Sequence, residues 1–241
     1  MTTQRTRSGL PEALEALRDG LIVSCQAYPG EAMRDPRVMT AVAQAVVEGG
    51  AAGIRAQGLA DLRAIHAHLD VPLIGLVKTG SDGVFITPTV ADALSVARAG
   101  AQIVALDGTR RPRPDGRPLA ASIEAVHAAG ALVMADCGCM EDALLSIEAG
   151  ADCVGTTLAG YTGTRARSSG PDLALLADMV AGCTVPVIAE GRIRNPDDAA
   201  LCLASGAFAV VVGTAITHPT SIARTFSDRL ASLDQPGRKR W

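Results

Sequence analysis

Residues 131–156 read ALVMADCGCMEDALLSIEAGADCVGT, and this stretch contains one complete structural repeat of the chain. It opens on one apolar run, Ala131–Ala135, and closes on another, Cys153–Thr156. A loop and a segment with helical periodicity lie between the two runs, and Gly150 ends that segment. Continuous apolar runs of about four to eight residues are typical of parallel strands that are buried on both faces. The stretch therefore predicts a strand–helix–strand unit.

The same unit recurs along the whole sequence. The apolar runs that carry it are Leu21–Cys25, Gly53–Ala56, Leu73–Val77, Ile103–Leu106, Ala131–Ala135, Cys153–Thr156, Val185–Ala189 and Phe208–Val212. Eight such units without a break in composition, in a chain of 241 residues, predict an α/β fold: a closed (β/α)8 barrel, or TIM barrel. The alternative is a doubly wound open sheet. The number of units favours the barrel, and no G-x-G-x-x-G sequence follows the first run.

Proline and glycine mark the helix boundaries. Asp35-Pro36, Thr87-Pro88 and Asn195-Pro196 each combine a capping residue with proline at the first helical position. Glycine suits the left-handed residue that ends a helix, because it has no Cβ atom. The glycines that follow helical segments and precede alanine are Gly50, Gly100, Gly130, Gly150 and Gly206.

We expect residues 1–241 to form a single TIM-barrel domain. Residues 1–19 are expected to be an N-terminal cap segment, in which Pro11–Arg18 forms a short helix that covers the bottom of the barrel. Residues 233–241 contain the basic run Arg238-Lys239-Arg240 and are expected to be a solvated C-terminal tail.

Composition argues against nucleic-acid and membrane partners. The formal net charge is −3, and the chain has one Trp, two Tyr and three Phe. A nucleic-acid surface would need a basic footprint, and usually aromatic side chains on which bases stack. No apolar stretch reaches about 18 residues without a charge, which is the length that a spanning helix requires. The first twenty residues lack the apolar core of a secretory signal. We therefore expect no nucleic-acid or membrane partner.

Cysteine and histidine usage indicates a reducing compartment and no metal site. The six cysteines lie scattered in or beside apolar runs, which is typical of reduced thiols in a cytoplasmic protein. Cys137 and Cys139 lack the two-residue spacing of a zinc or redox pair. The four histidines have no common metal-ligand spacing and follow no apolar run, so we expect them at the surface and expect no catalytic metal.

Polar residues stand where each apolar run ends. In a TIM barrel the active site lies at the C-terminal ends of the strands, where loops supply the functional side chains. The polar residues at the run ends would form a ring at this mouth. Buried charges cost free energy unless they are paired, so folding alone does not require such a ring. Ion pairs across the barrel mouth are the structural alternative. The residues of the ring are Gln26, Arg55, Lys78, Asp107, Asp136, Thr157, Glu190 and Gly213-Thr214.

Lys78 and Glu190 are the candidate proton-transfer groups. Desolvation and a nearby cation such as Arg55 would lower the pKa of Lys78, which could then act as a base or form a Schiff base. A carboxyl group in an apolar mouth can keep its proton near neutral pH, so Glu190 could serve as a general acid. The structural alternative is a salt bridge from Lys78 to Glu190 or Asp107.

The loops after the last two runs predict a phosphate site. Gly191-Arg192 follows the seventh run and Gly213-Thr214 follows the eighth. These are the loops that recurrently bind phosphate in TIM barrels. Glycine lets backbone N–H groups approach an anion, and Arg192 adds positive charge. Alternatively, both glycines serve only to allow tight turns.

The strand-end residues and their neighbours, taken together, resemble a known family. The stretches that carry the resemblance are Ser24-Cys-Gln26, Gly53-Ile-Arg55, Val77-Lys78, Ile86-Thr-Pro88-Thr89, Ala105-Leu-Asp107, Thr109-Arg-Arg-Pro-Arg-Pro-Asp-Gly116, Met134-Ala-Asp136-Cys137, Val154-Gly-Thr-Thr-Leu158, Gly160-Tyr-Thr162, Ile188-Ala-Glu-Gly-Arg-Ile193 and Val212-Gly-Thr-Ala-Ile216. The sequence is similar to the N-acetylmannosamine-6-phosphate 2-epimerases, also called N-acylglucosamine-6-phosphate 2-epimerases. The likeness runs from about Leu21 to Pro219. One departure is the loop Thr79–Gly83, where a bulkier polar or acidic stretch is expected.

The resemblance implies an isomerase that inverts C2 of a 2-acetamido sugar 6-phosphate. It implies amino-sugar catabolism after sialic-acid breakdown, with no cofactor. It also implies Lys78 as the base at C2 and Glu190 as its acid partner. The expected substrate-binding residues are Gln26, Arg55, Asp136 and Thr157 around the sugar, and Gly191, Arg192, Gly213 and Thr214 at the phosphate.

The residues read alone are compatible with this chemistry. The C2 proton lies alpha to the C1 aldehyde of the open-chain sugar, and its removal needs a neutral amine and a donor for the enolate oxygen. Lys78 would supply the first, and Gln26 or Arg55 the second. Whether one base serves both faces, or Lys78 and Glu190 take one face each, stays open. The alternatives are a Schiff-base aldolase or lyase and a non-catalytic sugar-phosphate-binding barrel. Apolar helical surfaces favour a homodimer.

Overall fold

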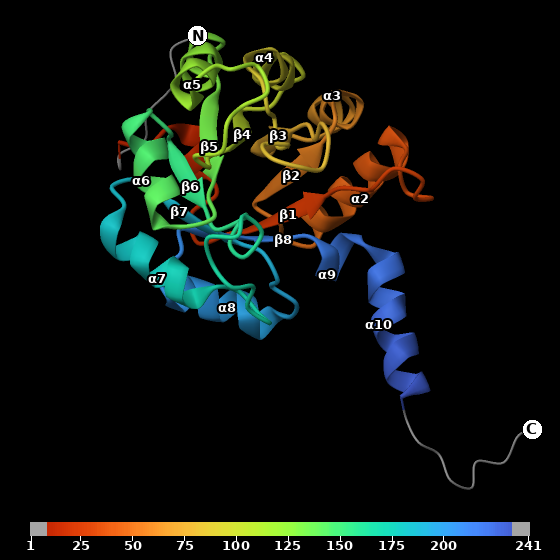
Figure 1. Ribbon diagram of the computed structural model, residues 1–241. Coiled ribbons are helices and arrows are strands. Elements are labelled where there is room, and N and C mark those ends of the chain that lie inside the picture. Colours follow the sequence, from red (N-terminus) through yellow and green to blue (C-terminus); the bar gives the residue numbers. More distant parts are fainter. Residues whose placement is uncertain (1–8, 233–241) are drawn as a thin grey trace, which may run out of the picture.

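The computed structural model describes residues 9–232 and shows a closed barrel of eight parallel strands in sequential order, β1 to β8 (Figure 1). Each strand pairs with the next, and β8 pairs with β1 to close the ring. The predicted TIM barrel is therefore confirmed, and every predicted run overlaps a strand, with limits that differ by at most two residues. The strands are β1 Leu21–Cys25, β2 Gly53–Gln57, β3 Leu73–Leu76, β4 Ile103–Asp107, β5 Leu132–Asp136, β6 Cys153–Gly155, β7 Val187–Glu190 and β8 Ala209–Val212.

Helices connect the strands on the outside of the ring (Figure 1). One short helix precedes β1, and two helices follow β8. The helices are α1 Glu12–Glu15, α2 Pro36–Glu48, α3 Leu59–His68, α4 Val90–Arg98, α5 Leu119–Ala128, α6 Met140–Glu148, α7 Leu173–Gly182, α8 Pro196–Ala204, α9 Thr214–Thr217 and α10 Pro219–Ala231.

Two of the three predicted helix starts are confirmed. The Asp35 side chain accepts a hydrogen bond from the Arg37 N–H at the start of α2, and Asn195 caps α8 in the same way. The start at Thr87-Pro88 is wrong, because α4 begins at Val90 and Thr89 caps it. Thr87 instead takes a left-handed conformation with φ of 45°, in a loop at the barrel mouth. The five predicted glycine stops all have positive φ, between 85° and 104°.

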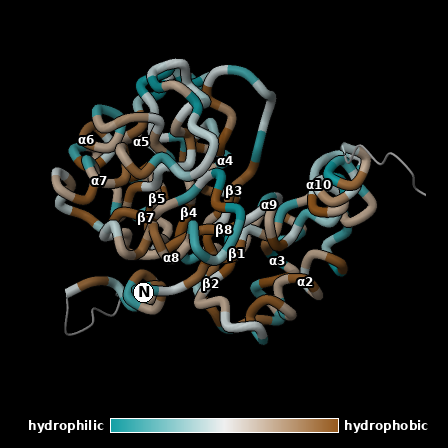
Figure 2. Tube along the Cα trace, turned by 90° about the horizontal axis from the view of Figure 1, so that it is seen from below, coloured by the Kyte–Doolittle hydropathy of each residue, from teal (hydrophilic) through white to brown (hydrophobic). Residues whose placement is uncertain are grey.

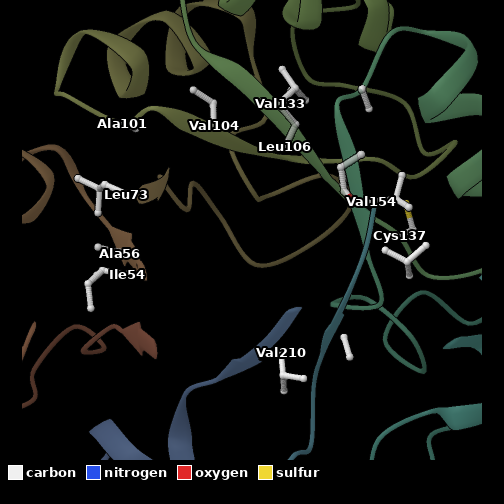
Figure 3. Packing of buried hydrophobic residues seen from close by; sticks show 14 of the residues in the cluster. Ile54, Ala56, Leu73, Ala101, Val104, Leu106, Val133, Cys137, Val154 and Val210 are labelled. Atoms are coloured by element: carbon white, nitrogen blue, oxygen red, sulfur yellow. Dashed lines mark hydrogen bonds between the residues drawn. The ribbon is translucent and has the colours of Figure 1, made fainter. Parts of the chain in front are cut away.

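Alternation along the strands divides the core into an outer and an inner layer, because successive side chains of a strand point to opposite faces. One set points outward and packs under the helices. Figure 3 shows part of this layer, with Ile54 and Ala56 from β2, Val104 and Leu106 from β4, and Val133 from β5.

The second set of side chains points into the barrel and forms a separate cluster that includes Ile22, Ile103 and Met134. Leu14 and Leu17 pack against this inner cluster and are 1% and 0% exposed. The turn that contains Leu14 and Leu17 therefore packs against the interior of the barrel, and α1 spans only Glu12–Glu15. Beyond α1 the chain continues in tight turns with hydrogen bonds three residues apart, rather than as helix to residue 18.

The helix α10 stands apart from the barrel in both views (Figures 1 and 2). It contacts mainly α9, and none of its residues is buried. Phe226 and Leu230 lie one turn apart on α10 and are 69% and 67% exposed. The expected tail, residues 233–241, lies outside the described residues, and so does the start of the cap segment. Among residues 9–232, no helix combines the length and the apolar character needed to cross a bilayer.

Candidate active site

The alternation of the strands places the predicted polar residues inside the barrel. Arg55 lies two residues after Gly53 on β2, so both positions face the same side of the strand. Asp136 lies two residues after Met134 on β5, and Met134 points into the barrel. Glu190 follows the inward Ile188 on β7. The apolar inner cluster fills the barrel below this level. The C-terminal mouth therefore receives charged side chains from several strands at once.

Arg55 and Asp136 form a buried, two-pronged ion pair across the barrel. Arg55 Nη2 donates to Asp136 Oδ2 at 2.6 Å, and Nη1 donates to Oδ1 at 3.1 Å. Both side chains are essentially inaccessible, at 1% and 0% exposed. Burial alone would lower the pKa of Arg55, but the facing Asp136 and Glu190 raise it overall. The guanidinium is thus a permanent positive charge at the centre of the site.

Glu190 ends β7 beside this pair. Its Oε2 lies 3.3 Å from Arg55 Nη1 and 3.0 Å from the Thr157 hydroxyl. The side chain is 13% exposed, so it faces the barrel mouth while remaining largely desolvated. Burial raises the pKa of Glu190, because removal from water penalises the charged form; Arg55 and Lys78 oppose this effect. A carboxyl group in this setting is suited to donate a proton.

Lys78 follows β3 and reaches the same mouth. Its Nζ donates a 2.9 Å hydrogen bond to Gln26 Oε1, and Gln26 Nε2 donates to the Ser24 hydroxyl at 2.8 Å. No carboxylate of the described chain lies within salt-bridge distance of Lys78, so the expected alternative, a direct ion pair, is absent there. Burial lowers the pKa of Lys78, and the charge of Arg55 lowers it further. These conditions favour the neutral amine that a proton abstraction requires.

A small hairpin fixes the backbone of the lysine. Lys78 forms an antiparallel bridge with Ile86, and the Thr87 N–H donates to Val77 O at 2.7 Å. The chain therefore turns back over residues 79–85 and returns beside β3. Thr87 adopts φ of 45°, which is uncommon for a β-branched residue and costs about 1–3 kcal/mol. Such strain is often found at functional sites.

The predicted phosphate loops meet at the same face of the barrel. Gly191 and Arg192 both have positive φ, 107° and 57°, so the chain turns sharply after β7. Within residues 9–232, neither of their N–H groups makes a backbone hydrogen bond. The Arg192 guanidinium donates to Gly170 O, Ala159 O and the Ser168 hydroxyl at 2.8–3.0 Å. The side chain of Arg192 therefore braces the β6–α7 loop, and its backbone faces the turn.

The second loop begins directly after β8. Gly213 precedes α9, and a Cβ atom at this position would lie 3.2 Å from Ser24 Cβ. This spacing is tighter than usual side-chain packing, so the position favours glycine. Thr214 starts α9 and is exposed, with no hydrogen bond to its N–H among the described residues. The Thr217 hydroxyl donates to Ser24 O at 2.6 Å and ties the loop to β1.

Comparison with known proteins shows to which family the chain is similar. Residues 39–232 match the model of a family described as "Putative N-acetylmannosamine-6-phosphate epimerase". The chain belongs to the N-acetylmannosamine-6-phosphate 2-epimerase family. A relative from Cutibacterium acnes with this description is 51% identical over 220 residues, which cover 90% of this chain and 96% of the relative. A relative from Corynebacterium glutamicum is 48% identical, with 89% and 94% covered.

A solved epimerase of the family has the same fold. The N-acetylmannosamine-6-phosphate 2-epimerase from Clostridium perfringens superposes with a TM-score of 0.89 at 36% identity, and covers 95% of this chain and 100% of its own. A thiamine phosphate pyrophosphorylase from Pyrococcus furiosus, at 22% identity and a TM-score of 0.55, shares the fold alone. The sequence resemblance to the epimerases is therefore confirmed.

In this member of the epimerase family, Asp107 has a different environment from its neighbours in the ring. Its carboxylate accepts from the Thr109 hydroxyl at 2.6 Å and from Arg111 Nη2 at 2.7 Å. Both partners lie in the β4–α5 loop. The Asp107 side chain is fully buried and holds this loop, so it is not available to sugar hydroxyls.

Sequence reasoning missed two residues of the candidate site. Ser24 orients Gln26, as described above, and Tyr28 covers the lysine, with Lys78 Nζ 5.7 Å from its ring centroid. The Tyr28 N–H donates to Glu31, and Glu31 pairs with His218 at 2.5 Å, so this histidine is not the free surface residue expected. Tyr28 is one of only two tyrosines and lies two residues after Gln26. This proximity was the available signal.

Proposed function

We propose that this chain interconverts N-acetylmannosamine 6-phosphate and N-acetylglucosamine 6-phosphate. Lys78 removes the C2 proton of the open-chain sugar, and the C–H electron pair moves to the C1 carbonyl oxygen as an enolate. Return of a proton to the opposite face of C2 gives the other epimer, and no cofactor is consumed. The reaction belongs to amino-sugar catabolism after sialic-acid breakdown.

The arrangement around Lys78 is the observation that carries this proposal. A desolvated amine with a lowered pKa lies in one mouth with a carboxyl group of raised pKa, Glu190. Such a pair can hold a free base and a proton donor at the same pH. We assign the base role to Lys78, and proton donation during ring opening and reprotonation to Glu190.

The remaining site residues bind and polarise the substrate. The fixed charge of Arg55, anchored by Asp136, stabilises the negative charge that develops on the enolate oxygen. Gln26 accepts from Lys78 and donates to Ser24, so it orients the amine towards the reacting carbon. Thr157 completes this polar wall between Asp136 and Glu190.

We assign the 6-phosphate to the loops after β7 and β8. The free N–H groups of Gly191, Arg192 and Thr214 are the proposed donors. Arg192 contributes its charge while its guanidinium stays bound to the β6–α7 loop. Phosphate binding in these loops lets binding energy from a remote part of the substrate serve the reacting carbon.

The chain is also proposed to act as a cytoplasmic homodimer. All six cysteines are free, and five of them are buried, as expected in a reducing compartment. The exposed apolar residues Phe226 and Leu230, with the half-buried Ile222, line one side of α10 at four-residue spacing. A second copy of the chain would cover this stripe. Sedimentation velocity, with Phe226→Glu as the dissociated comparison, tests the assembly.

Proton NMR in D2O tests the proposed reaction directly. N-acetylmannosamine 6-phosphate should give the gluco epimer with deuterium at C2, and Lys78→Ala should abolish both signals. Unchanged and unlabelled substrate would overturn the proposal. Borohydride treatment with substrate separates the aldolase alternative, since only a Schiff base on Lys78 would be trapped as a stable adduct.

A further inference from the structure

The Thr157 hydroxyl lies between two carboxyl groups. Its Oγ1 is 2.6 Å from Asp136 Oδ1 and 3.0 Å from Glu190 Oε2. Both distances are within the range of O–H···O hydrogen bonds. A hydroxyl group carries one proton and can therefore donate to only one of the two carboxyl groups.

The direction of donation follows from the neighbours of each carboxyl group. Asp136 receives both Nη groups of Arg55, at 2.6 and 3.1 Å, and the shorter contact from Thr157. Glu190 has only the more distant 3.3 Å approach of the Nη1 that Asp136 already shares. Asp136 is therefore the carboxylate that accepts from Thr157. A proton on Glu190 would satisfy the second short contact, because two lone pairs would otherwise face each other at 3.0 Å.

We propose that Thr157 is a positioning residue that keeps the mobile proton of the site on Glu190 and so leaves Lys78 as a free amine. Glu190 donates to the Thr157 hydroxyl, which in turn donates to Asp136. This inference rests on the proposed epimerase mechanism. The proton that Glu190 holds is the one that would otherwise make Lys78 an ammonium group, unable to abstract the C2 proton.

The backbone around Thr157 holds this chain of hydrogen bonds in place. The neighbouring Thr156 hydroxyl donates to Glu190 O at 2.9 Å and accepts from the Glu190 N–H at 3.0 Å. These two bonds join the end of β6 to the end of β7, although the residues are 34 positions apart. The distance between Thr157 and Glu190 is therefore set by the strands and does not depend on a flexible loop.

Every charged group that faces Glu190 affects how the proton is divided between Glu190 and Lys78. Arg55 faces it from β2, Lys78 from the end of β3, and Asp136 from β5. Arg55 and Asp136 compensate each other in their ion pair. One proton then remains to be divided between Lys78 and Glu190, and these two groups titrate as a coupled pair. The Thr157 hydroxyl can accept a hydrogen bond only from the protonated form of Glu190, so it shifts the proton from Lys78 towards Glu190.

Thr157→Val tests the proposal, because valine keeps the shape of threonine and lacks the hydroxyl. We expect kcat/KM at neutral pH to fall about 10- to 100-fold, the usual effect of losing a hydrogen bond in a charged network. The pH profile should also narrow. Its alkaline limb should move down by about one pH unit, because protonated Glu190 loses its hydrogen-bond acceptor and releases its proton more readily. Thr157→Ser keeps the hydroxyl and should restore both the rate and the alkaline limb.

Infrared difference spectroscopy supplies a readout that needs no turnover. The wild-type protein should show the carbonyl band of a protonated carboxyl group near neutral pH, and Glu190→Gln should remove it. Thr157→Val should weaken this band. If Thr157→Val does not fold, Thr157→Ala removes the same hydroxyl with less bulk.

Two results would overturn the inference: an unchanged alkaline limb in a folded Thr157→Val enzyme, or a protonated-carboxyl band that the loss of this hydroxyl does not affect. Failure of the epimerase mechanism itself would look different. The wild type would then incorporate no deuterium at C2, whatever the infrared band shows.

Discussion

Neutralising Asp136 is the sharpest test of the buried charge network. Asp136→Asn preserves the shape of the side chain and removes the counter-ion of Arg55. In the wild type this pair has contacts of 2.6 and 3.1 Å, and both side chains are at most 1% exposed. Removing one partner of a buried pair costs about 3–5 kcal/mol, because the other charge is left uncompensated. Asparagine still offers one carbonyl oxygen, so we expect a loss near the lower end, about 3 kcal/mol.

Urea unfolding at constant protein concentration and neutral pH measures this loss. The matched control is Arg37→Gln, which removes the solvent-exposed pair between Arg37 and Asp35, also joined at 3.0 Å. The control should unfold almost like the wild type, because exposed pairs contribute little. A loss in Asp136→Asn as small as that of the control would refute the argument that burial makes the Arg55 charge dependent on Asp136.

Asp136→Asn should also alter the chemistry. Glu190, 3.3 Å from Arg55, becomes the nearest remaining carboxyl group. It should ionise to neutralise the guanidinium, which lowers its pKa towards the ordinary value and passes the proton to Lys78. Deuterium incorporation at C2 should therefore fall more at low pH than at high pH. Equal losses across the pH range would point to a purely structural role for Asp136.

Four further predictions follow from single contacts. Lys78→Ala should reduce C2 deuterium incorporation at least about 100-fold in the NMR assay, because no other amine lies in the described site. Leu14→Ala should lower the free energy of unfolding by about 2–5 kcal/mol in urea, since this side chain is 1% exposed in the barrel bottom. Gly191→Ala should raise KM at little cost to kcat, because φ of 107° disfavours a Cβ atom in the phosphate turn. Burial raises the pKa of Cys25 to about 12, so Ellman's reagent at pH 8 should modify it only after unfolding.

The fold could be predicted because each strand corresponds to a continuous apolar run in the sequence. Burial on both faces removes the polar positions that would break the pattern, so the limits of the strands are visible in the sequence. Along each run, successive side chains also alternate between the inner and the outer face of the barrel. Arg55 lies two residues after Gly53 and therefore on the same, inner face of the barrel. This position explains why Arg55 is buried and why its partner lies across the barrel. The positions of the strand ends and the alternation of side chains together predict the charged residues of the candidate site.

Loop conformation could not be predicted in the same way, because it depends on contacts between distant segments. Thr87-Pro88 has the local signal of a helix start, yet Thr87 is held at φ of 45° by the hairpin that fixes Lys78. Arg192 stands in a phosphate loop by sequence, but the carbonyl groups of the β6–α7 loop take up its guanidinium. Tertiary hydrogen bonds outweigh local preference in both cases.

The charge balance of the site explains why a barrel with so apolar an interior carries four ionisable groups at its mouth. Arg55 and Asp136 cancel each other, so in the proposed working state Lys78 and Glu190 share one proton. With the proton on Lys78, the site holds four charged groups and no free base. With the proton on Glu190, it holds one ion pair, a free amine and an acid. Burial favours the second state, because it places fewer charges in a desolvated cavity. In the proposed mechanism, the apolar core beneath the site thereby supports catalysis as well as folding.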